Sequence, residues 1–244
     1  MDALRHRALV LAKGLPATPS NLARIAAATS DAAAKWAFGQ WELRHRARHK
    51  FAQADQLFFT REALEQATHE RVAQFHANLF PEGVTVFDLT TGIGSDLIAL
   101  AARGPVHGFE VDRERAELAA ANLRALGLAG ELHIGNAMEL ATTHGIEYVF
   151  ADPARRQAGA RVRDREDYQP DPKDVIERFG DVRIGGIKLS PMLPDSELRE
   201  LGPRVEFVSF GGECREALVM WGMDVEPAWG ARNVETNEFL SSDG

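Results

Sequence analysis

The residues with the clearest chemical potential lie in one short segment, residues 84–96 (VTVFDLTTGIGSD), which combines two carboxylates with two glycines. Gly92 and Gly94 carry no Cβ atom, so a ligand can approach the backbone N–H groups at the start of the following helix. Asp88 and Asp96 flank this turn with negative charge. Because a diphosphate needs positive or neutral surroundings, the segment favours a cradle for a cationic ligand.

The spacing of nearby residues separates two kinds of nucleotide site. A dinucleotide-binding turn follows G-x-G-x-x-G, where the third glycine allows close helix packing, and this chain has Leu97 at that position. A strand expected over 105–111 contains Glu110, which follows Asp88 by 22 residues. That is near the spacing at which an acid ending the second strand accepts hydrogen bonds from a ribose. We therefore expect an adenosine-containing ligand without a pyrophosphate.

The pattern Asp88-x-x-x-Gly92-x-Gly94 resembles the first motif of class I S-adenosylmethionine (SAM)-dependent methyltransferases. This resemblance implies that SAM is the cofactor and that Asp88 faces the amino end of its methionine portion. Thr90 stands where many members carry a further glycine. The cofactor-binding residues expected on this basis are Asp88, Thr90, Thr91, Gly92, Gly94, Asp96, Glu110, Val111, Asn136, Ala137, Phe59 and Thr60.

Two of these groups have an alternative explanation. Asn136 lies in the turn where family members contact the adenine, and its side chain could instead close an Asx-type turn. Phe59 and Thr60 belong to a segment, 51–80, that resembles the part before the SAM motif in trimethylguanosine-synthase-like methyltransferases and in bacterial methyltransferases with a THUMP-like domain. In such proteins this segment lies over the cofactor, whereas phenylalanines in this position could also be simple core residues.

The acceptor side of the site is expected after the fourth strand, at Asp152-Pro153-Ala154-Arg155. Methyltransferases of this class place a D/N/S-P-P-x motif there, and this chain lacks the aromatic residue of the NPPY type. Asp152 would orient the acceptor or take its proton, and Pro153 would shape the pocket. Lys188, near the end of a strand expected over 182–190, could pair with Asp152 or touch the substrate, or it could be a snorkelling lysine at the sheet edge.

Basic residues suggest how a nucleic acid could be held. Five arginines fall within residues 155–165, and such a loop could clamp phosphates and stack a base, or form an acid-paired surface lid. The substrate-binding candidates are Arg155, Arg156, Arg161 and Tyr168. A second basic group, expected on an exposed helix face, comprises Arg44, Arg46, Arg48 and Lys50.

Two further types of site are not expected. His45 and His49 are four residues apart, but no carboxylate or cysteine stands beside them at ligand spacing, so we expect no metal. Cys214 is the single cysteine, which excludes an internal disulfide. As the nucleophile of a pyrimidine C5-methyltransferase it is disfavoured, because Glu213 and Glu216 lie nearby and would raise its thiol pKa.

The bulk composition is typical of a soluble globular chain of 244 residues, with 45% hydrophobic and 26% charged residues. The net charge of −8 divides unevenly, since residues 1–82 carry 11 Lys/Arg and 8 Asp/Glu while residues 83–244 carry 17 and 28. A basic extension on an acidic body is compatible with nucleic-acid binding. Without a long apolar run or a signal sequence, we expect a cytoplasmic protein with no membrane partner.

The expected fold is α/β and Rossmann-like, with a seven-stranded, mostly parallel sheet and an N-terminal helical extension. We expect one continuous helix over 61–80. The expected division is a helical domain over 1–80, a SAM-dependent methyltransferase domain over 81–230, and a tail or truncated further domain over 231–244. The favoured function is methylation of a base in RNA, such as tRNA or rRNA, possible acceptors including a guanine exocyclic nitrogen. A small-molecule methyltransferase and a non-catalytic SAM- or RNA-binding module are the alternatives.

Overall fold

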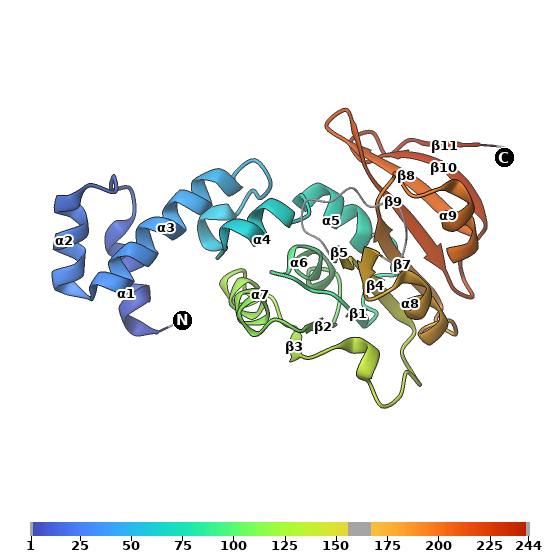
Figure 1. Ribbon diagram of the computed structural model, residues 1–244, viewed down its shortest axis with the longest axis horizontal. Coiled ribbons are helices and arrows are strands. Elements are labelled where there is room, and N and C mark those ends of the chain that lie inside the picture. The colour runs from blue at the N-terminus through green and yellow to red at the C-terminus, as the bar shows by residue number, and fades with distance from the viewer. Residues whose placement is uncertain (1, 156–166, 243–244) are drawn as a thin grey trace.

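The computed structural model describes residues 2–155 and 167–242 of the chain. Figure 1 shows a twisted sheet with helices on both faces and a group of helices, α1–α3, that extends away from the sheet. The N-terminal elements are α1 (Ala3–Ala12), α2 (Pro19–Ala28), α3 (Asp31–Ala47), η1 (Ala54–Gln56), α4 (Arg61–Gln66) and α5 (Glu70–Ala77).

The sheet has nine strands in the order β11-β10-β8-β9-β7-β4-β1-β2-β3. Its strands are β1 (Val86–Asp88), β2 (Val106–Glu110), β3 (Glu131–Ile134), β4 (Tyr148–Ala151), β7 (Ile184–Leu189), β8 (Arg204–Phe210), β9 (Glu213–Trp221), β10 (Ala228–Asn233) and β11 (Phe239–Ser241). The other elements are α6 (Ser95–Ala101), α7 (Arg113–Ala125), η2 (Ala137–Glu139), β5 (Ala154–Arg155), β6 (Tyr168–Gln169), α8 (Pro172–Arg178) and α9 (Asp195–Leu201). The Rossmann-like α/β fold is confirmed, but the sheet is mixed and larger than the expected seven strands.

The two additional strands are β10, parallel to β8, and β11, antiparallel to β10. A buried ion cluster explains why they join the sheet. Glu206 of β8 is 2% exposed and accepts from Arg204 Nε at 2.8 Å and from Arg232 Nε at 2.9 Å. Both guanidinium groups also lie over the ring of Phe239 in β11. The boundary expected between residues 230 and 231 therefore falls inside β10.

Apolar side chains fill both faces of the sheet. One cluster joins the sheet to α8 and α9 and includes Val175 and Leu198. The other joins the opposite face to α5, α6 and α7 and includes Leu97 and Leu123. The central strand β4 is buried along its whole length and carries a continuous apolar run, whereas the edge strand β3 is largely exposed.

The helix expected over 61–80 is wrong, because the chain breaks between α4 and α5. Lys50 Nζ donates to the backbone carbonyls of Leu64, Glu65 and Ala67 at 2.9, 3.0 and 2.8 Å, which ends α4. His69 begins α5 as its N-cap and accepts from the Arg71 N–H. The break turns Thr68 towards the sheet, where its side chain is buried.

The exposed basic face expected at the end of α3 is also wrong for Arg44. Its side chain is 4% exposed, donates from Nε to the Leu57 carbonyl at 2.9 Å, and lies over the rings of Trp41 and Phe58. Burial lowers the pKa of Arg44 to about 10, against the opposing effect of Asp55. Arg44 therefore stabilises the link after α3 and is not available to a phosphate.

Within the part of the chain that the structure describes, none of the helices combines the length and the apolar character that crossing a membrane requires.

Candidate active site

The glycine turn connects the end of β1 to the start of α6. Both glycines have positive φ, +58° at Gly92 and +91° at Gly94, which other residues rarely adopt. A Cβ atom at Gly92 would have no heavy atom within 4 Å, whereas one at Gly94 would meet Ala119 Cβ of α7 at 3.3 Å. The two glycines therefore differ in role, since Gly92 borders open space and Gly94 allows α7 to pack closely.

Glu110, at the end of β2, is tied directly to this turn. Its Oε2 accepts from the Gly92 N–H and its Oε1 accepts from the Asp112 N–H, both at 2.9 Å. Each carboxylate oxygen keeps a second lone pair, so ligand hydroxyl groups can still donate to it. The next residue, Val111, is 65% exposed and lies at the same edge of the sheet. This edge can hold a ribose beside the open side of Gly92.

Asp88 ends β1 and is almost fully buried. Its Oδ1 accepts from the Thr90 N–H at 3.2 Å, while its Oδ2 is buried without a hydrogen-bond partner among the described residues. Burial, and then the nearby Asp96, raise the pKa of Asp88 well above its usual value. A buried carboxyl with one unpaired oxygen favours a cationic hydrogen-bond donor, and the ammonium group of SAM fits this requirement.

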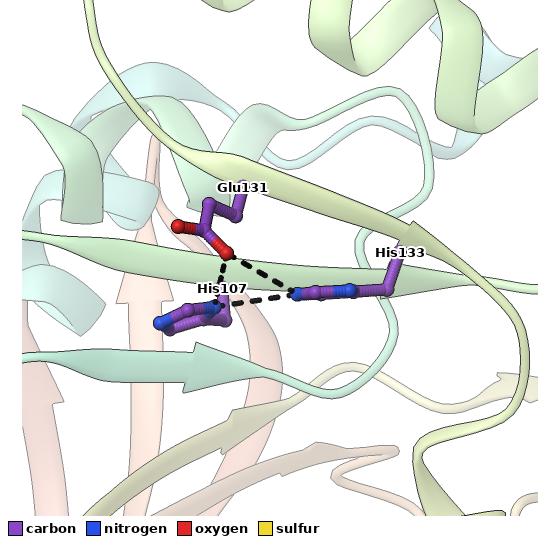
Figure 2. A group of neighbouring side chains, drawn as sticks. All are labelled: His107, Glu131 and His133. Atoms are coloured by element: carbon purple, nitrogen blue, oxygen red, sulfur yellow. Dashed lines mark hydrogen bonds and ion pairs between the residues drawn. The ribbon is translucent and has the colours of Figure 1, made fainter.

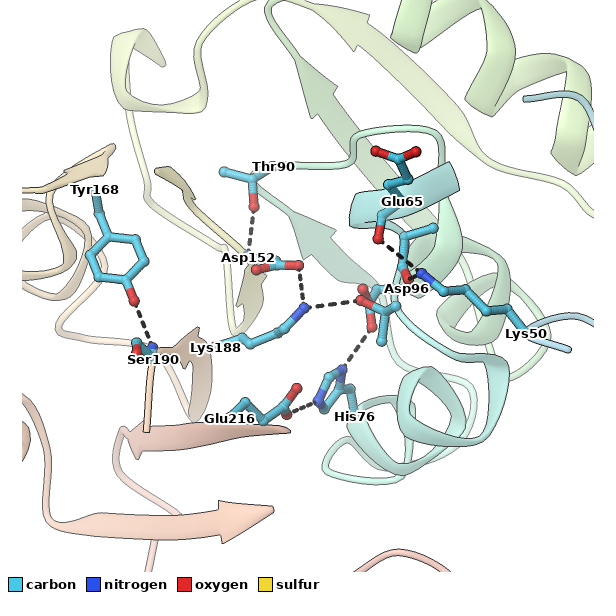
Figure 3. A network of polar contacts seen from close by, with 12 residues as sticks. Lys50, Glu65, His76, Thr90, Asp96, Asp152, Tyr168, Lys188, Ser190 and Glu216 are labelled. Atoms are coloured by element: carbon cyan, nitrogen blue, oxygen red, sulfur yellow. Dashed lines mark hydrogen bonds and ion pairs between the residues drawn. The ribbon is translucent and has the colours of Figure 1, made fainter. Parts of the chain in front are cut away.

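A second acid, Asp96, lies just inside α6 and forms part of a buried chain of charges (Figure 3). Its Oδ1 pairs with His76 Nδ1 at 2.7 Å, and His76 Nε2 pairs with Glu216 Oε1 at 2.5 Å. Burial alone would lower the pKa of His76, but Glu216 and Asp96 together raise it to about 10. An imidazolium therefore bridges α5, α6 and β9 and fixes the helix that follows the glycine turn.

The expected acceptor side brings together Asp152, Lys188 and Thr90. Asp152 directly follows β4, and its N–H donates to Thr90 Oγ1 at 2.6 Å. Lys188 Nζ donates to Asp152 Oδ2 at 2.7 Å and to Thr68 Oγ1 at 3.2 Å. Burial raises the pKa of Asp152, and Lys188 opposes this effect. Burial would lower the pKa of Lys188, but the carboxylates of Asp152, Glu216 and Asp96 outweigh it and raise that pKa. The contact is therefore an ion pair, in which the Asp152 side chain is 31% exposed and the Lys188 side chain 20% exposed.

These groups meet at the point where the strand order reverses. From β1 the chain order runs outwards through β2 and β3 on one side, and β4 continues on the other. Ligands of open α/β sheets bind outside the carboxyl ends of the strands at such a switch point. Asp88 and Asp152 come from the two strands that border this point, which explains how one site can face both a cofactor and an acceptor.

The remaining expected cofactor residues surround this centre. Thr91 Oγ1 donates to the Asp88 carbonyl at 3.4 Å. Asn136 Oδ1 accepts from the Met138 N–H at 3.0 Å, so it closes the Asx-type turn, and Ala137 behind it is buried. Phe59 packs in a cluster that also contains Ile93 of the glycine turn, and Thr60 is the N-cap of α4.

The expected substrate residues are placed less uniformly. Pro153 follows Asp152, and Arg155 lies in β5, which pairs with β6. Tyr168 is 3% exposed and its hydroxyl accepts from the Ser190 N–H at 2.6 Å, so its ring lies within the core (Figure 3). Arg156 and Arg161 lie outside the described residues.

Four residues of the site escaped the sequence analysis: Thr68, His76, Asn122 and Glu216. Asn122 of α7 is buried, accepts from the Phe58 N–H at 2.7 Å, and donates to the carbonyls of Phe58 and Ile93. It thereby joins the segment before the sheet to the glycine turn. A signal for His76 was present, since it follows Val72 by four residues on the apolar side of its helix.

Burial also raises the pKa of the Cys214 thiol, although the side chain lies at the exposed start of β9. A raised pKa lowers the thiolate fraction at neutral pH, so Cys214 lacks the activation that a nucleophilic cysteine requires.

Comparison with known proteins places this geometry in a structural class. The sequence matches no protein-family model and no curated protein sequence. A Porphyromonas gingivalis candidate methyltransferase superposes with a TM-score of 0.77 at 26% identity, covering 92% of this chain and 58% of its own. A Listeria monocytogenes candidate class I SAM-dependent methyltransferase gives 0.52 at 12% identity, covering 94% and 90%. A Clostridium difficile candidate methylase gives 0.53 at 15%, covering 66% and 54%.

This chain therefore spans little more than half the length of the Porphyromonas gingivalis protein. The chain has a Rossmann-like methyltransferase fold, whose sheet here has nine strands.

Proposed function

We propose that the chain uses SAM to methylate a base in RNA by direct in-line transfer. One observation carries the proposal: Asp88, with its unpaired buried oxygen, and Glu110, bonded to the Gly92 N–H, enclose the open side of the glycine turn at the switch point. A cationic nucleoside complements this pair of acids, whereas a diphosphate does not. The fold that the chain shares with methyltransferases supports the same cofactor.

The roles of the residues follow from their positions. Asp88 would accept from the SAM ammonium group, and Glu110 would accept from the ribose hydroxyls. When bound, SAM supplies an electrophilic methyl group. Asp152 would accept a hydrogen bond from an N–H of the acceptor, and Lys188 holds the Asp152 carboxylate ionised and oriented. Holding the two partners in near-attack geometry supplies up to about 7–11 kcal/mol.

RNA is the proposed substrate because of the basic residues that follow the acceptor motif. Arg155 stands three residues after Asp152, and the sequence continues with further arginines to residue 165. Guanidinium groups beside a reaction site suit phosphate binding and base stacking. A guanine exocyclic nitrogen is the acceptor that best matches a single carboxylate, because Asp152 can accept a hydrogen bond from one of its N–H groups.

The experiment that tests this function separates cofactor binding from transfer. Binding of S-adenosylhomocysteine is measured by calorimetry, and transfer is measured with radiolabelled SAM and RNA from a strain lacking the protein. Asp88→Asn should weaken binding, whereas Asp152→Asn should keep binding and lower transfer by about 10²–10⁴-fold. Asp181→Asn is the matched control, because Asp181 is exposed and precedes the amino end of β7, whereas Lys188 lies near its carboxyl end.

Four results would contradict the proposal in different ways. Absence of S-adenosylhomocysteine binding would refute the cofactor. Binding with label transferred to a metabolite but not to RNA would favour a small-molecule methyltransferase. Unchanged transfer in Asp152→Asn would remove that residue from the reaction, and binding without any transfer would favour a non-catalytic module.

A further inference from the structure

Three side chains with metal-binding atoms converge on one face of the β2–β3 strand pair (Figure 2). We propose that His107, Glu131 and His133 form a site for a divalent transition-metal ion and that zinc is the ion it fits best. His107 lies three residues before Glu110, near the amino end of β2, so this site is separate from the glycine turn at the carboxyl ends of the strands. It does not rest on the proposed function.

The strand register creates the cluster. His107 lies directly opposite Glu131 in the parallel pair, and His133 follows Glu131 by two residues on the same face of β3. His107 and His133 are 26 residues apart in the sequence, which is why their spacing matches no metal-binding motif. The expectation of no metal was based only on His45 and His49. The pairing of β2 with β3 brings His107, Glu131 and His133 together, and their spacing in the sequence does not reveal this.

Two of the three distances between the ligand atoms agree with a tetrahedral ion, and the third, between His133 and the exposed Glu131, is longer. His107 Nδ1 lies 3.3 Å from His133 Nε2 and 3.4 Å from Glu131 Oε2, and the last two atoms are 4.0 Å apart. A point equidistant from all three lies about 2.1 Å from each, which is close to zinc–nitrogen and zinc–oxygen bond lengths. Donor atoms around a tetrahedral ion at that bond length are about 3.4 Å apart, against about 3.0 Å around an octahedral one.

Aromatic stacking holds both imidazole rings in place. Phe87 stacks on His107 with ring centroids 4.7 Å apart, and Phe109 stacks on His133 at the same separation. The rings therefore need little further ordering when an ion binds. Glu131 is the most exposed of the three, with 72% of its side chain accessible, so water can complete the coordination from the solvent side.

The donor set selects the class of ion. Two neutral imidazoles and one carboxylate give the site a charge of −1, which attracts a divalent cation. Imidazole suits zinc, copper, iron and nickel, whereas magnesium and calcium prefer sites made of oxygen atoms. Because β3 is the last strand of the sheet and its ends are exposed, a bound ion would fasten this edge to β2.

Zinc binding to the chelator-treated full chain tests the proposal. Calorimetry should show one zinc ion bound per chain in excess magnesium, and cobalt should give the intense visible absorption of tetrahedral coordination. At zinc about 100-fold above its dissociation constant, the thermal midpoint should rise by about 5–10 °C.

Variants locate the ion. His107→Phe and His133→Phe keep the stacked rings but remove the ligand nitrogens, and each should weaken zinc binding by more than the 10–100-fold that loss of an outer-shell partner costs. Glu131→Gln should weaken it as well, whereas His45→Phe, at an exposed site on α3, should leave it unchanged. Absence of zinc uptake by the wild-type chain, or equal affinity in both ligand-site Phe variants and the wild type, would overturn the proposal.

Discussion

His76→Gln removes the positive charge that joins Asp96 to Glu216, and its effect on stability should depend strongly on pH. The pKa of His76 rises from 6.5 to about 10 in the folded chain, because the two carboxylates outweigh its burial. Since each tenfold change in proton affinity corresponds to about 1.4 kcal/mol, the bound proton stabilises the fold by about 5 kcal/mol. Loss of one member of a buried ion pair costs a similar amount, about 3–5 kcal/mol.

The direction of the pH dependence follows from the raised pKa. The contribution of His76 is fully present below pH 6.5 and is lost as the pH rises through about 10. The difference in unfolding free energy between wild type and His76→Gln should therefore be largest near pH 6 and fall to about a third of that value at pH 9. Comparing the two proteins cancels the contribution of every group whose titration the substitution leaves unchanged.

Urea denaturation at several pH values measures this difference, and His45→Gln, at an exposed position on α3, is the control. The NMR titration of the His76 ring in the wild-type chain gives the same information if the variant does not fold. A His76 ring that titrates near 6.5, or a stability difference that stays constant from pH 6 to pH 9, would refute the buried imidazolium.

Three further outcomes are expected. Gly92→Ala places a methyl group on the open side of the turn and should weaken S-adenosylhomocysteine binding, measured by calorimetry, while Gly94→Ala should mainly lower the thermal midpoint, because its Cβ meets Ala119; equal effects on binding would contradict this difference. Glu206→Gln should lower the free energy of unfolding by about 1–3 kcal/mol, since two partly buried guanidinium groups lose the charge of their buried partner, and hydrogen exchange should show loss of protection in β10 and β11; unchanged protection there would be inconsistent with the cluster holding these strands. Asp88 should release a proton when SAM binds at a pH below its raised pKa, and this is detected as a binding enthalpy that varies with the buffer; the same variation in Asp88→Asn would assign the proton to another group.

The parts that could be predicted from the sequence are those set by local patterns. The apolar run of β1, the glycines and the following helix all lie within residues 84–101, so their order and the position of Asp88 follow from propensity and turn chemistry. The expectation of a mostly parallel sheet of seven strands came from the resemblance to class I methyltransferases. The extra strands could not be predicted in this way, because β10 depends on the pairing of Arg232 with Glu206, which is 26 residues away.

Residues that act through long-range contacts were missed or misplaced for the same reason. Lys50 and Arg44 lie in one basic segment of the sequence. In the fold, the Lys50 side chain caps the C-terminal end of α4 by donating to the Ala67 carbonyl, whereas the guanidinium group of Arg44 is buried against the ring of Trp41. His76 and Glu216 are 140 residues apart, so no spacing rule joins them. Sequence patterns locate the groups that face a ligand, whereas the charges that hold those groups in place become visible only when the strands and helices are assembled.

The balance of charges beneath the site shows why Asp88 is the residue left for the cofactor. Asp96 and Glu216 share His76, and Asp152 pairs with Lys188, so two cations serve three carboxylates within the described network. Asp88 lies at the same edge, and its Oδ2 is buried without a hydrogen-bond partner among the described residues. Because no cation among the described residues pairs with Asp88, burying its charged form is costly, and this raises its pKa well above the usual value. A ligand that brings its own positive charge to the end of β1 removes this cost, and one that brings further negative charge increases it.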